Sequence, residues 1–360
     1  MNMYENCESV EQSPQDLVTA RTVEGFKTGL DKFLDQNNIN EYVYITMLNS
    51  SRIPTTFYLM GLSGQEDIYG WISIPMCFMF FVSITGNGLI LHVIYWDYKL
   101  RQPMFLFLST LAVTDILFSL FTSPSVLSIF LFHHHNIQSQ ACLLQMFFIH
   151  SLSITESSIL VAMAFDRFIA ICHPLRYTAI LTNSVVGKII LVSVFRGTLI
   201  HIPPVSSLVF LPYCKGNVLS HSYCLHQDVM KLACDGTNTF NIIYGLVVIL
   251  CTVTVDLILI TISYILIIRS VLQVTSKLQQ HKLFHTCVSH LCAVCMFYIP
   301  IVTLSIVHRF MIQVPPVFIK FMANTYLFIP PMLNPIIYSI KSRQIQESFC
   351  RAFHLGKITG

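Results

Sequence analysis

Seven stretches of this chain are long and apolar enough to cross a lipid bilayer as helices. A spanning helix needs roughly 20 mostly apolar residues, because the hydrocarbon core of a membrane is about 30 Å thick. The seven predicted spans are Trp71–Tyr95, Met104–Phe130, Cys142–Ile171, Val185–Leu208, Phe240–Ile268, Leu283–Val307 and Val317–Ile340. No internal repeat at a fixed period relates them, which argues against an inverted-repeat transporter. The sequence therefore predicts an all-α membrane protein whose residues 71–340 form a seven-transmembrane helix bundle.

Composition supports a membrane protein and argues against two other classes. Only 11% of the 360 residues are charged, whereas soluble domains carry about 25%. The net charge of +3, without a basic tract interleaved with aromatic residues, argues against a nucleic-acid-binding protein. The sequence also contains no metalloprotease helix motif, glycine-rich phosphate loop or serine nucleophile elbow, so an enzyme is not expected.

Basic residues in the short loops predict the orientation of the bundle. Loops that face the cytoplasm carry an excess of lysine and arginine. The basic residues after the first, third, fifth and seventh spans are Lys99, Arg101, Arg176, Arg269, Lys277, Lys282, Lys341, Arg343, Arg351 and Lys357. The sequon Asn49-Ser50-Ser51 before the first span agrees, because an N-linked glycan is added on the lumenal side. We therefore expect a multi-pass plasma-membrane protein with an extracellular N-terminus and a cytoplasmic C-terminus.

Both ends of the chain differ in character from the bundle. Residues 1–46 are polar and acid-rich, so we expect them to be disordered, followed by an extracellular segment over residues 47–70. Residues 341–360 form the predicted cytoplasmic tail. Within it, Ile345, Phe349 and Phe353 recur every fourth residue, which predicts a short amphipathic helix on the membrane surface. Cys350 in this helix is either a palmitoylation site or an ordinary thiol of its apolar face.

Four polar residues lie within the predicted spans and are expected to face one another. Ionisable groups inside a membrane are costly and often functional. Asn87, Asp115, Glu156 and Asn334 would form one buried polar centre in the middle of the bundle. Two carboxylates close together share a proton or a cation, so this centre is either a switch sensitive to a sodium ion or proton, or a hydrogen-bond network that fixes helix register. No other cofactor is expected.

Cysteine and histidine residues outside the spans have separate interpretations. Cys142, Cys214, Cys224 and Cys234 lie on the predicted outer side, where two disulfides are expected. Spacing alone leaves three possible connectivities. His133-His134-His135 invites a metal-site interpretation, but consecutive loop histidines cannot all face one ion, and we do not predict a metal.

A series of motifs resembles the rhodopsin-like G protein-coupled receptors, and within them the olfactory receptors. The matching segments are Gly86-Asn87, Pro103–Ser109, Met163–Tyr177, Ser263-Tyr264, Lys282–His290 and Pro331–Ser339. Four of these segments look like family patterns: Pro103–Ser109 like PMYxFLS, Met163–Tyr177 like MAYDRYVAICHPLRY, Lys282–His290 like KAxxTCxSH, and Pro331–Ser339 like PMLNPIIYS. The resemblance covers about residues 49 to 350. The segments Phe147–His150, Leu219–Cys234 and Leu304–Phe310 resemble the class I, fish-like subgroup.

This resemblance implies pairings and roles for particular residues. By it, Cys142 pairs with Cys224, and Cys214 with Cys234. The residues implied to bind a small odorant are His150, Gln227, Ser305 and Arg309. The residues implied in activation and G protein coupling are Asp166, Arg167, Tyr264, Lys282, Asn334, Pro335 and Tyr338. The subgroup tends to answer to water-soluble acids, and Arg309 suits a carboxylate because guanidinium binds it through two hydrogen bonds. The alternative for Arg309 is a cation at the helix–water boundary.

The resemblance also implies the partners, which are a small odorant, membrane lipid and a stimulatory olfactory-type G protein that raises cyclic AMP. Phe165 and Phe168 stand where the family often has tyrosines, which leaves the strength of coupling open. Two alternatives remain: a metabolite receptor of the same fold outside the nose, and, more remotely, a small-solute transporter.

Family members begin shortly before the sequon, so Met47 is a natural start of the receptor. We expect residues 1–46 to be an extension from a gene model or an alternative exon. A native N-terminus found upstream of Met47 by mass spectrometry would contradict this.

Overall fold

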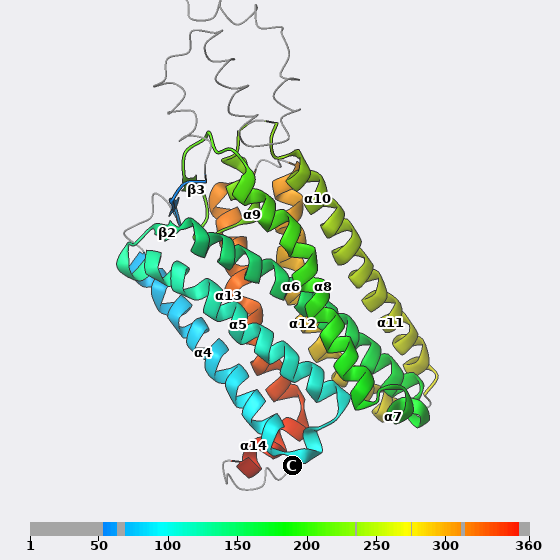
Figure 1. Cartoon of the computed structure of the whole chain (residues 1–360). Helices are drawn as coiled ribbons and strands as arrows, with labels where there is room; N and C mark the ends of the chain where they lie inside the picture. Colours follow the sequence, from blue (N-terminus) through cyan, green and yellow to red (C-terminus); the bar gives the residue numbers. More distant parts are fainter. Residues whose placement is uncertain (1–52, 63–68, 235, 275, 311–313, 353–360) are drawn as a thin grey trace, which may run out of the picture. The chain divides into compact units, whose positions relative to one another are not determined.

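A computed structural model of the chain describes residues 53–62, 69–234, 236–274, 276–310 and 314–352. The predicted extension at residues 1–46 and the sequon at Asn49 lie outside these ranges. The long helices within them are α4 (Tyr69–Trp96), α5 (Pro103–Phe132), α6 (Ser139–Cys172), α8 (Asn183–Phe210), α10 (Thr239–Ile249), α11 (Val255–Leu272), α12 (Lys277–Phe310) and α13 (Pro316–Lys341). A π-helical turn, η4 (Leu250–Thr254), joins α10 to α11, so these two helices form one span (Figure 1).

The seven-helix prediction is confirmed, although one span is less apolar than the others. Six of the described helical spans are long and apolar enough to cross a membrane. The seventh, α13, is not among them and carries Lys320, Asn324 and Asn334. It nevertheless packs against α4, α5 and α12 and completes the bundle.

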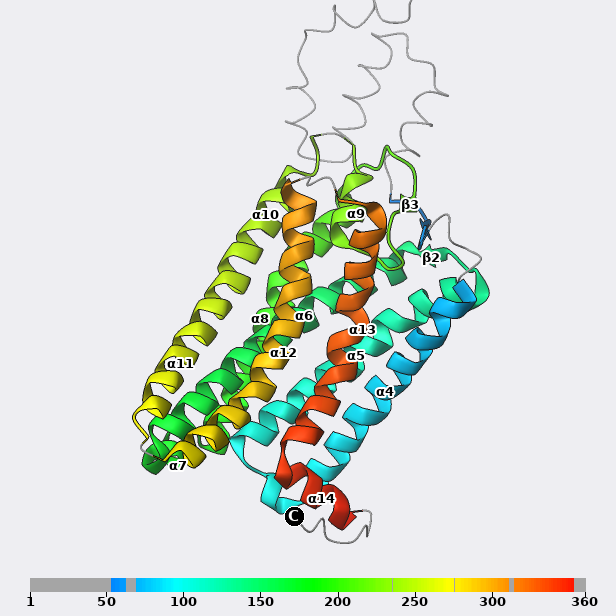
Figure 2. The same ribbon diagram turned by 180° about the vertical axis from the view of Figure 1, so that it is seen from behind.

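The helix α6 occupies the centre of the bundle. It contacts α5, α8, α11 and α12, while α13 lies beside α12 on one side and α4 on the other (Figure 2). More of its length is buried than that of any other described span. A residue on α6 can therefore contact several helices, and the predicted site residues of this helix can link them.

Close packing of α6 against α8 depends on one glycine. A Cβ atom added at Gly197 of α8 would lie 2.5 Å from the Thr155 hydroxyl oxygen and even closer to the Ser151 carbonyl oxygen. Small residues let membrane helices approach closely, because there is little hydrophobic drive to hold them together otherwise.

We expect Gly197→Ala to lower the free energy of unfolding by about 1–3 kcal/mol, the usual cost of overpacking. Thermal unfolding of the purified protein measures this. The matched control is Gly187→Ala on the same helix, where an added Cβ meets nothing within 4 Å. Equal stability of the two variants would contradict the close-packing account.

A small sheet, which the sequence analysis did not predict, covers one end of the bundle. Strand β1 (Thr56–Leu59) pairs antiparallel with β2 (Asn136–Gln138) and parallel with β3 (Val218–Leu219), in the order β2-β1-β3. Phe57 and Leu59 are buried beneath it. Two of the three consecutive histidines pack near this sheet. The His133 ring stacks on Tyr69, and the His135 ring stacks on Tyr58 of β1.

Short elements complete the described chain. They are η2 (Tyr98–Leu100), η3 (Pro174–Arg176), α7 (Tyr177–Ile180), α9 (His226–Lys231) and α14 (Arg343–Ala352). The helix α14 corresponds to the predicted amphipathic helix. Its Ile345 is buried in the bundle core, where α14 contacts α4 and α13. Phe353 lies outside the described residues.

Asp97, just after α4, holds α14 in place. Its carboxylate accepts hydrogen bonds from the Ser348 hydroxyl (2.5 Å) and from the Arg351 guanidinium (2.6 Å). Partial burial acts to raise the pKa of Asp97, but these hydrogen bonds, together with the positive charges of Arg351 and Lys99, outweigh it and lower the pKa.

A lowered pKa means that the charged carboxylate stabilises the docked state. That contribution is complete above the ordinary aspartate pKa and is lost as the pH falls through the lowered value. At neutral pH, we therefore expect the α14 backbone to exchange hydrogen faster in Asp97→Asn than in the wild type. In the wild type, we expect the α14 backbone to lose its protection only in acid. Mass spectrometry of residues 343–352 measures both. Identical exchange in wild type and Asp97→Asn at neutral pH would contradict the role of this carboxylate.

Candidate functional site

Three histidines from three elements meet near the sheet-covered end of the bundle. The His150 ring of α6 stacks on His201 of α8, with ring centres 5.4 Å apart, and meets His226 of α9 edge-on at 6.2 Å. The His150 side chain is half-buried, but its Nε2 atom is fully buried and has no hydrogen-bond partner among the described residues. A buried nitrogen without a partner is energetically costly, so such a group often awaits a ligand or water.

The neighbouring histidine is already satisfied. The Nε2 of His226 donates to the Asn241 side-chain oxygen (3.2 Å) with the ring in its neutral form. Burial lowers the pKa of His226, although the hydrogen bond to Asn241 acts in the opposite direction. The His226 ring is therefore neutral at physiological pH. Of His150 and His226, only His150 has a ring nitrogen that lacks a hydrogen-bond partner among the described residues.

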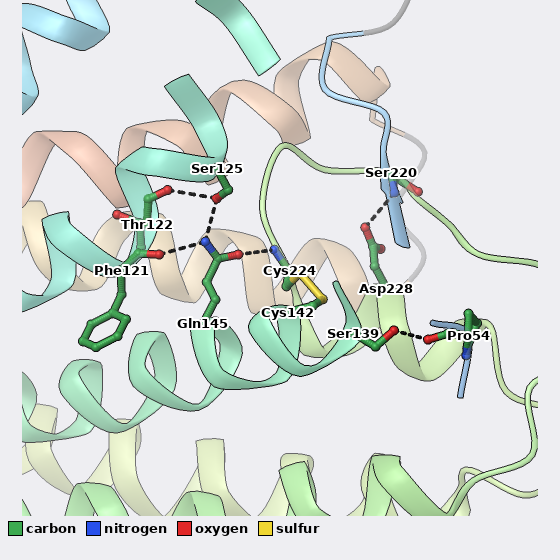
Figure 3. The surroundings of a disulfide bond; sticks show 10 residues. All are labelled: Pro54, Phe121, Thr122, Ser125, Ser139, Cys142, Gln145, Ser220, Cys224 and Asp228. Carbon is green, nitrogen blue, oxygen red and sulfur yellow. Dashed lines mark hydrogen bonds between the residues drawn. A yellow bond between two sulfur atoms is a disulfide. The ribbon is translucent and has the colours of Figure 1, made fainter. Parts of the chain in front are cut away.

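A disulfide fixes the loop that covers these histidines. Cys142 at the start of α6 is bonded to Cys224, which lies two residues before His226. Gln145 reinforces this link: its amide nitrogen donates to the Phe121 carbonyl (2.8 Å) and its amide oxygen accepts from the Cys224 backbone N–H (2.9 Å) (Figure 3). Cys214 and Cys234 form the second disulfide, so both pairings implied by the resemblance are present.

Buried charge organises the rest of this loop. Asp228 of α9 accepts a hydrogen bond from the Ser220 backbone N–H (3.1 Å) and pairs with the His221 ring and with Lys231 (3.6 Å). The loop thus has its own polar core, which holds α9 above His150.

The other residues implied to bind ligand are only partly placed. Gln227 follows His226 on α9 and is half-buried. Ser305 lies on α12, and its hydroxyl donates to the Ile301 carbonyl one turn earlier (2.7 Å). The side chain of Arg309 lies outside what the structure describes. The geometry therefore brings His150 and α9 together, whereas Ser305 of α12 bonds within its own helix.

Three of the four predicted polar residues gather in the middle of the bundle. The Asn334 amide nitrogen of α13 donates to both oxygens of Asp115 of α5 (3.0 and 3.3 Å) and lies within hydrogen-bonding reach of Glu156 of α6. Asn87 instead donates to the backbone carbonyls of Ser83 and Pro331 (2.9 Å each), so its described bonds tie α4 to α13.

A second buried polar network was not predicted from the sequence. The Arg196 guanidinium of α8 contacts Asp256 of α11 at 3.0 Å. The Ser157 hydroxyl of α6 donates to the same carboxylate (2.5 Å) and bonds to the Tyr298 hydroxyl of α12 (2.7 Å). Four helices therefore meet at Asp256. The sequence contained a signal for this network, because Arg196 and Asp256 are charged residues inside predicted spans.

The residues implied in coupling lie at the opposite end of the bundle. Arg167 sits 3.8 Å from Asp166, which accepts a hydrogen bond from the Tyr177 hydroxyl (2.8 Å). The Tyr264 hydroxyl bonds to His290 Nδ1 (2.7 Å), and the other ring nitrogen of His290 reaches the Leu160 carbonyl (3.0 Å).

Pro335 and Tyr338, two further residues implied in coupling, lie on α13 and are buried. The Tyr338 hydroxyl and the Nε of Arg167 have no hydrogen-bond partner among the described residues. Pro335 lies close to Gly86 of α4, where an added Cβ would come within 3.0 Å of its ring. The side chain of Lys282 lies outside what the structure describes. A buried tyrosine hydroxyl and a guanidinium Nε that lack hydrogen bonds suit a region that is completed by another molecule or conformation.

The fold is the seven-transmembrane fold of squid rhodopsin. Squid rhodopsin superimposes with a TM-score of 0.64, covering 80% of this chain and 86% of the rhodopsin chain at 16% identity, a likeness that concerns the fold alone.

The chain belongs to the olfactory receptor family, whose sequence model matches residues 76–355. Human olfactory receptor 51G2 is 50% identical over 305 residues, which is 85% of this chain and 97% of that receptor. Human olfactory receptor 51A4 is also 50% identical, over 84% of this chain and 96% of that receptor. The chain is therefore a multi-pass plasma-membrane odorant receptor that couples to G proteins, and not an enzyme.

Proposed function

We propose that the chain binds small carboxylic acids or related polar odorants beside His150 and activates a stimulatory olfactory-type G protein, which raises cyclic AMP. One observation carries the ligand half of this proposal. The buried Nε2 of His150 lacks a described partner directly beneath a loop that the Cys142–Cys224 disulfide holds in place. A small polar ligand would give this buried nitrogen a hydrogen-bond partner.

Arg309 of α12 supplies the charge for a carboxylate in this proposal. Guanidinium binds a carboxylate through two parallel hydrogen bonds, and burying an anion needs such a partner. Gln227 of α9 and Ser305 of α12 would complete the polar contacts, because they come from the loop and the helix that flank the same end of the bundle. The pairing of one cation with few neutral donors favours small monocarboxylic acids.

Activation follows as a shift between two arrangements of the bundle. A ligand changes such an equilibrium only by the difference in its affinity for the two states. A ligand held between α6, α9 and α12 would favour one position of α12, which carries Tyr298 near its middle and His290 toward the coupling end. We propose that α12 moves and that Arg167, Tyr264 and Tyr338 rearrange around the inserted G protein.

The proposed orientation places the N-terminus outside the cell. Disulfides persist in oxidising compartments, and both described disulfides lie in or beside the loop that carries β3 and α9. Strand β1 of the N-terminal segment pairs with β3 at the same end. The basic loops lie at the other end, as expected for the cytoplasmic side.

We further propose that Asp115 and Glu156 share a sodium ion or a proton. Two buried carboxylates near a single amide, that of Asn334, cannot both carry an uncompensated charge. If a cation is shared, replacing sodium with a large organic cation should change the basal cyclic AMP of the wild type and leave Asp115→Asn unaffected. If neither the cation nor the pH affects the wild type, the centre is a structural hydrogen-bond network.

The direct test of the ligand site is His150→Phe. Phenylalanine keeps an aromatic ring to stack on His201 but removes the Nε2 atom. We expect the ligand concentration for a half-maximal cyclic AMP response to rise about 10- to 100-fold, the loss of one hydrogen bond to a charged group. The exposed, remote His92→Phe serves as the control. An unchanged response in a well-expressed His150→Phe variant would contradict this position for the ligand.

A further inference from the structure

A groove between α4 and α5 lies apart from both polar regions described above. These helices run side by side and are joined at the end of the bundle where α14 lies (Figure 1). The groove has a volume of about 710 Å³, within the roughly 300–1,000 Å³ of typical small-molecule sites. It therefore has room for part of a lipid-sized molecule.

The walls of the groove are mostly apolar, although His92 and Ser109 also line it. Leu91 of α4 and Leu106 of α5 line it, together with Gly88. A Cβ atom added at Gly88 would meet nothing within 4 Å, so no neighbouring side chain fills this space. In a membrane, an acyl chain would fill it.

A positive charge and an aromatic belt mark the mouth of the groove. Arg101 lines the groove, is exposed, and forms no ion pair within the described part of the chain. Tyr95, Trp96 and Tyr98 beside it are 74%, 69% and 71% exposed. Tyrosine and tryptophan gather where a membrane meets water, so these side chains place Arg101 at the level of the lipid headgroups.

We propose that this groove binds an anionic phospholipid, with one acyl chain between α4 and α5 and its phosphate on Arg101. The apolar walls cannot select a lipid, because every lipid tail in the membrane is equally apolar. The positive charge of Arg101 selects an anionic phospholipid, since guanidinium forms two hydrogen bonds with a phosphate. The proposal requires only that the chain spans a membrane, and so stands apart from the ligand and G protein assigned above.

The full receptor is reconstituted in nanodiscs of phosphatidylcholine and phosphatidylserine, and native mass spectrometry counts the lipids it retains. The wild type is expected to retain phosphatidylserine in preference. Arg101→Gln should reduce this preference roughly fivefold, the effect of one basic residue at a membrane surface. Gly88→Leu fills the groove and should lower retention of both lipids. Arg269→Gln, an exposed arginine on α11, should match the wild type.

Thermal unfolding checks that the variants fold, and the Cβ atom that Gly88→Leu adds meets nothing within 4 Å. Equal retention of the two phospholipids by the wild type would overturn the proposal. So would a phosphatidylserine preference that survives in both Arg101→Gln and Gly88→Leu. If added cholesterol replaces the phospholipid in wild type and Arg101→Gln alike, the groove is a sterol site and the proposal fails.

Discussion

Arg196→Met is expected to destabilise the receptor by about 3–5 kcal/mol, the cost of leaving one partner of a buried ion pair without its counter-charge. Asp256 is almost fully buried, with its side chain 4% exposed, and Arg196 contacts it at 3.0 Å. The Arg196 side chain is itself 27% exposed, but without it the buried Asp256 carboxylate keeps the hydrogen bond from Ser157 and loses its counter-charge, so the variant would fold poorly and reach the cell surface in reduced amounts. Thermal unfolding in detergent and surface staining measure the two effects.

Two further variants make this prediction specific. Replacing both charges, as Arg196→Met with Asp256→Leu, leaves no unpaired charge and is expected to recover most of the lost stability. Arg269→Met removes an exposed arginine of the neighbouring helix and is expected to change little. An Arg196→Met variant as stable as the wild type would show that this ion pair does not hold α8 to α11.

Loss of the Cys142–Cys224 disulfide is the second large expected effect. In the chain-entropy account, a disulfide stabilises more as the loop it closes grows longer. This one joins residues 82 apart in sequence, whereas Cys214–Cys234 joins residues 20 apart. By that relation we expect Cys142→Ser to cost about 4–5 kcal/mol and Cys214→Ser about 3 kcal/mol.

The two variants should also differ in function. Cys224 adjoins the turn that leads to His226 and is tied to Gln145, so its release frees the loop above His150. Cys142→Ser should therefore lose the ligand response even at low temperature, where folding is favoured, while Cys214→Ser keeps part of it. Equal stability and equal response in the two variants would contradict the role given to the first disulfide.

The helices could be predicted from the sequence, but the contacts between them could not. A spanning helix satisfies its own backbone, so length and apolarity define it locally. This is why the predicted span Met104–Phe130 lies within α5 (Pro103–Phe132). The sheet formed by β1, β2 and β3 joins three distant segments of two to four residues each, too short to leave a clear alternating pattern.

The polar contacts show the same limit. Charged residues inside a span can be recognised individually, as Asp115 and Glu156 were, and the rule applies equally to Arg196 and Asp256. What the sequence cannot give is the partner, because Arg196 and Asp256 lie 60 residues apart on different helices. The cluster of His150 with His201 and His226 arises in the same way, from three elements that meet only after the bundle has packed.

The most direct test of the central proposal is cyclic AMP in cells that express the receptor, challenged with short- and medium-chain carboxylic acids, with wild type beside Arg309→Ala. Surface expression is measured in the same cells. We predict a dose-dependent rise in the wild type that Arg309→Ala abolishes at equal surface expression. A well-expressed wild type that stays silent to every acid, or an Arg309→Ala variant that responds as the wild type does, would contradict the proposed carboxylate site.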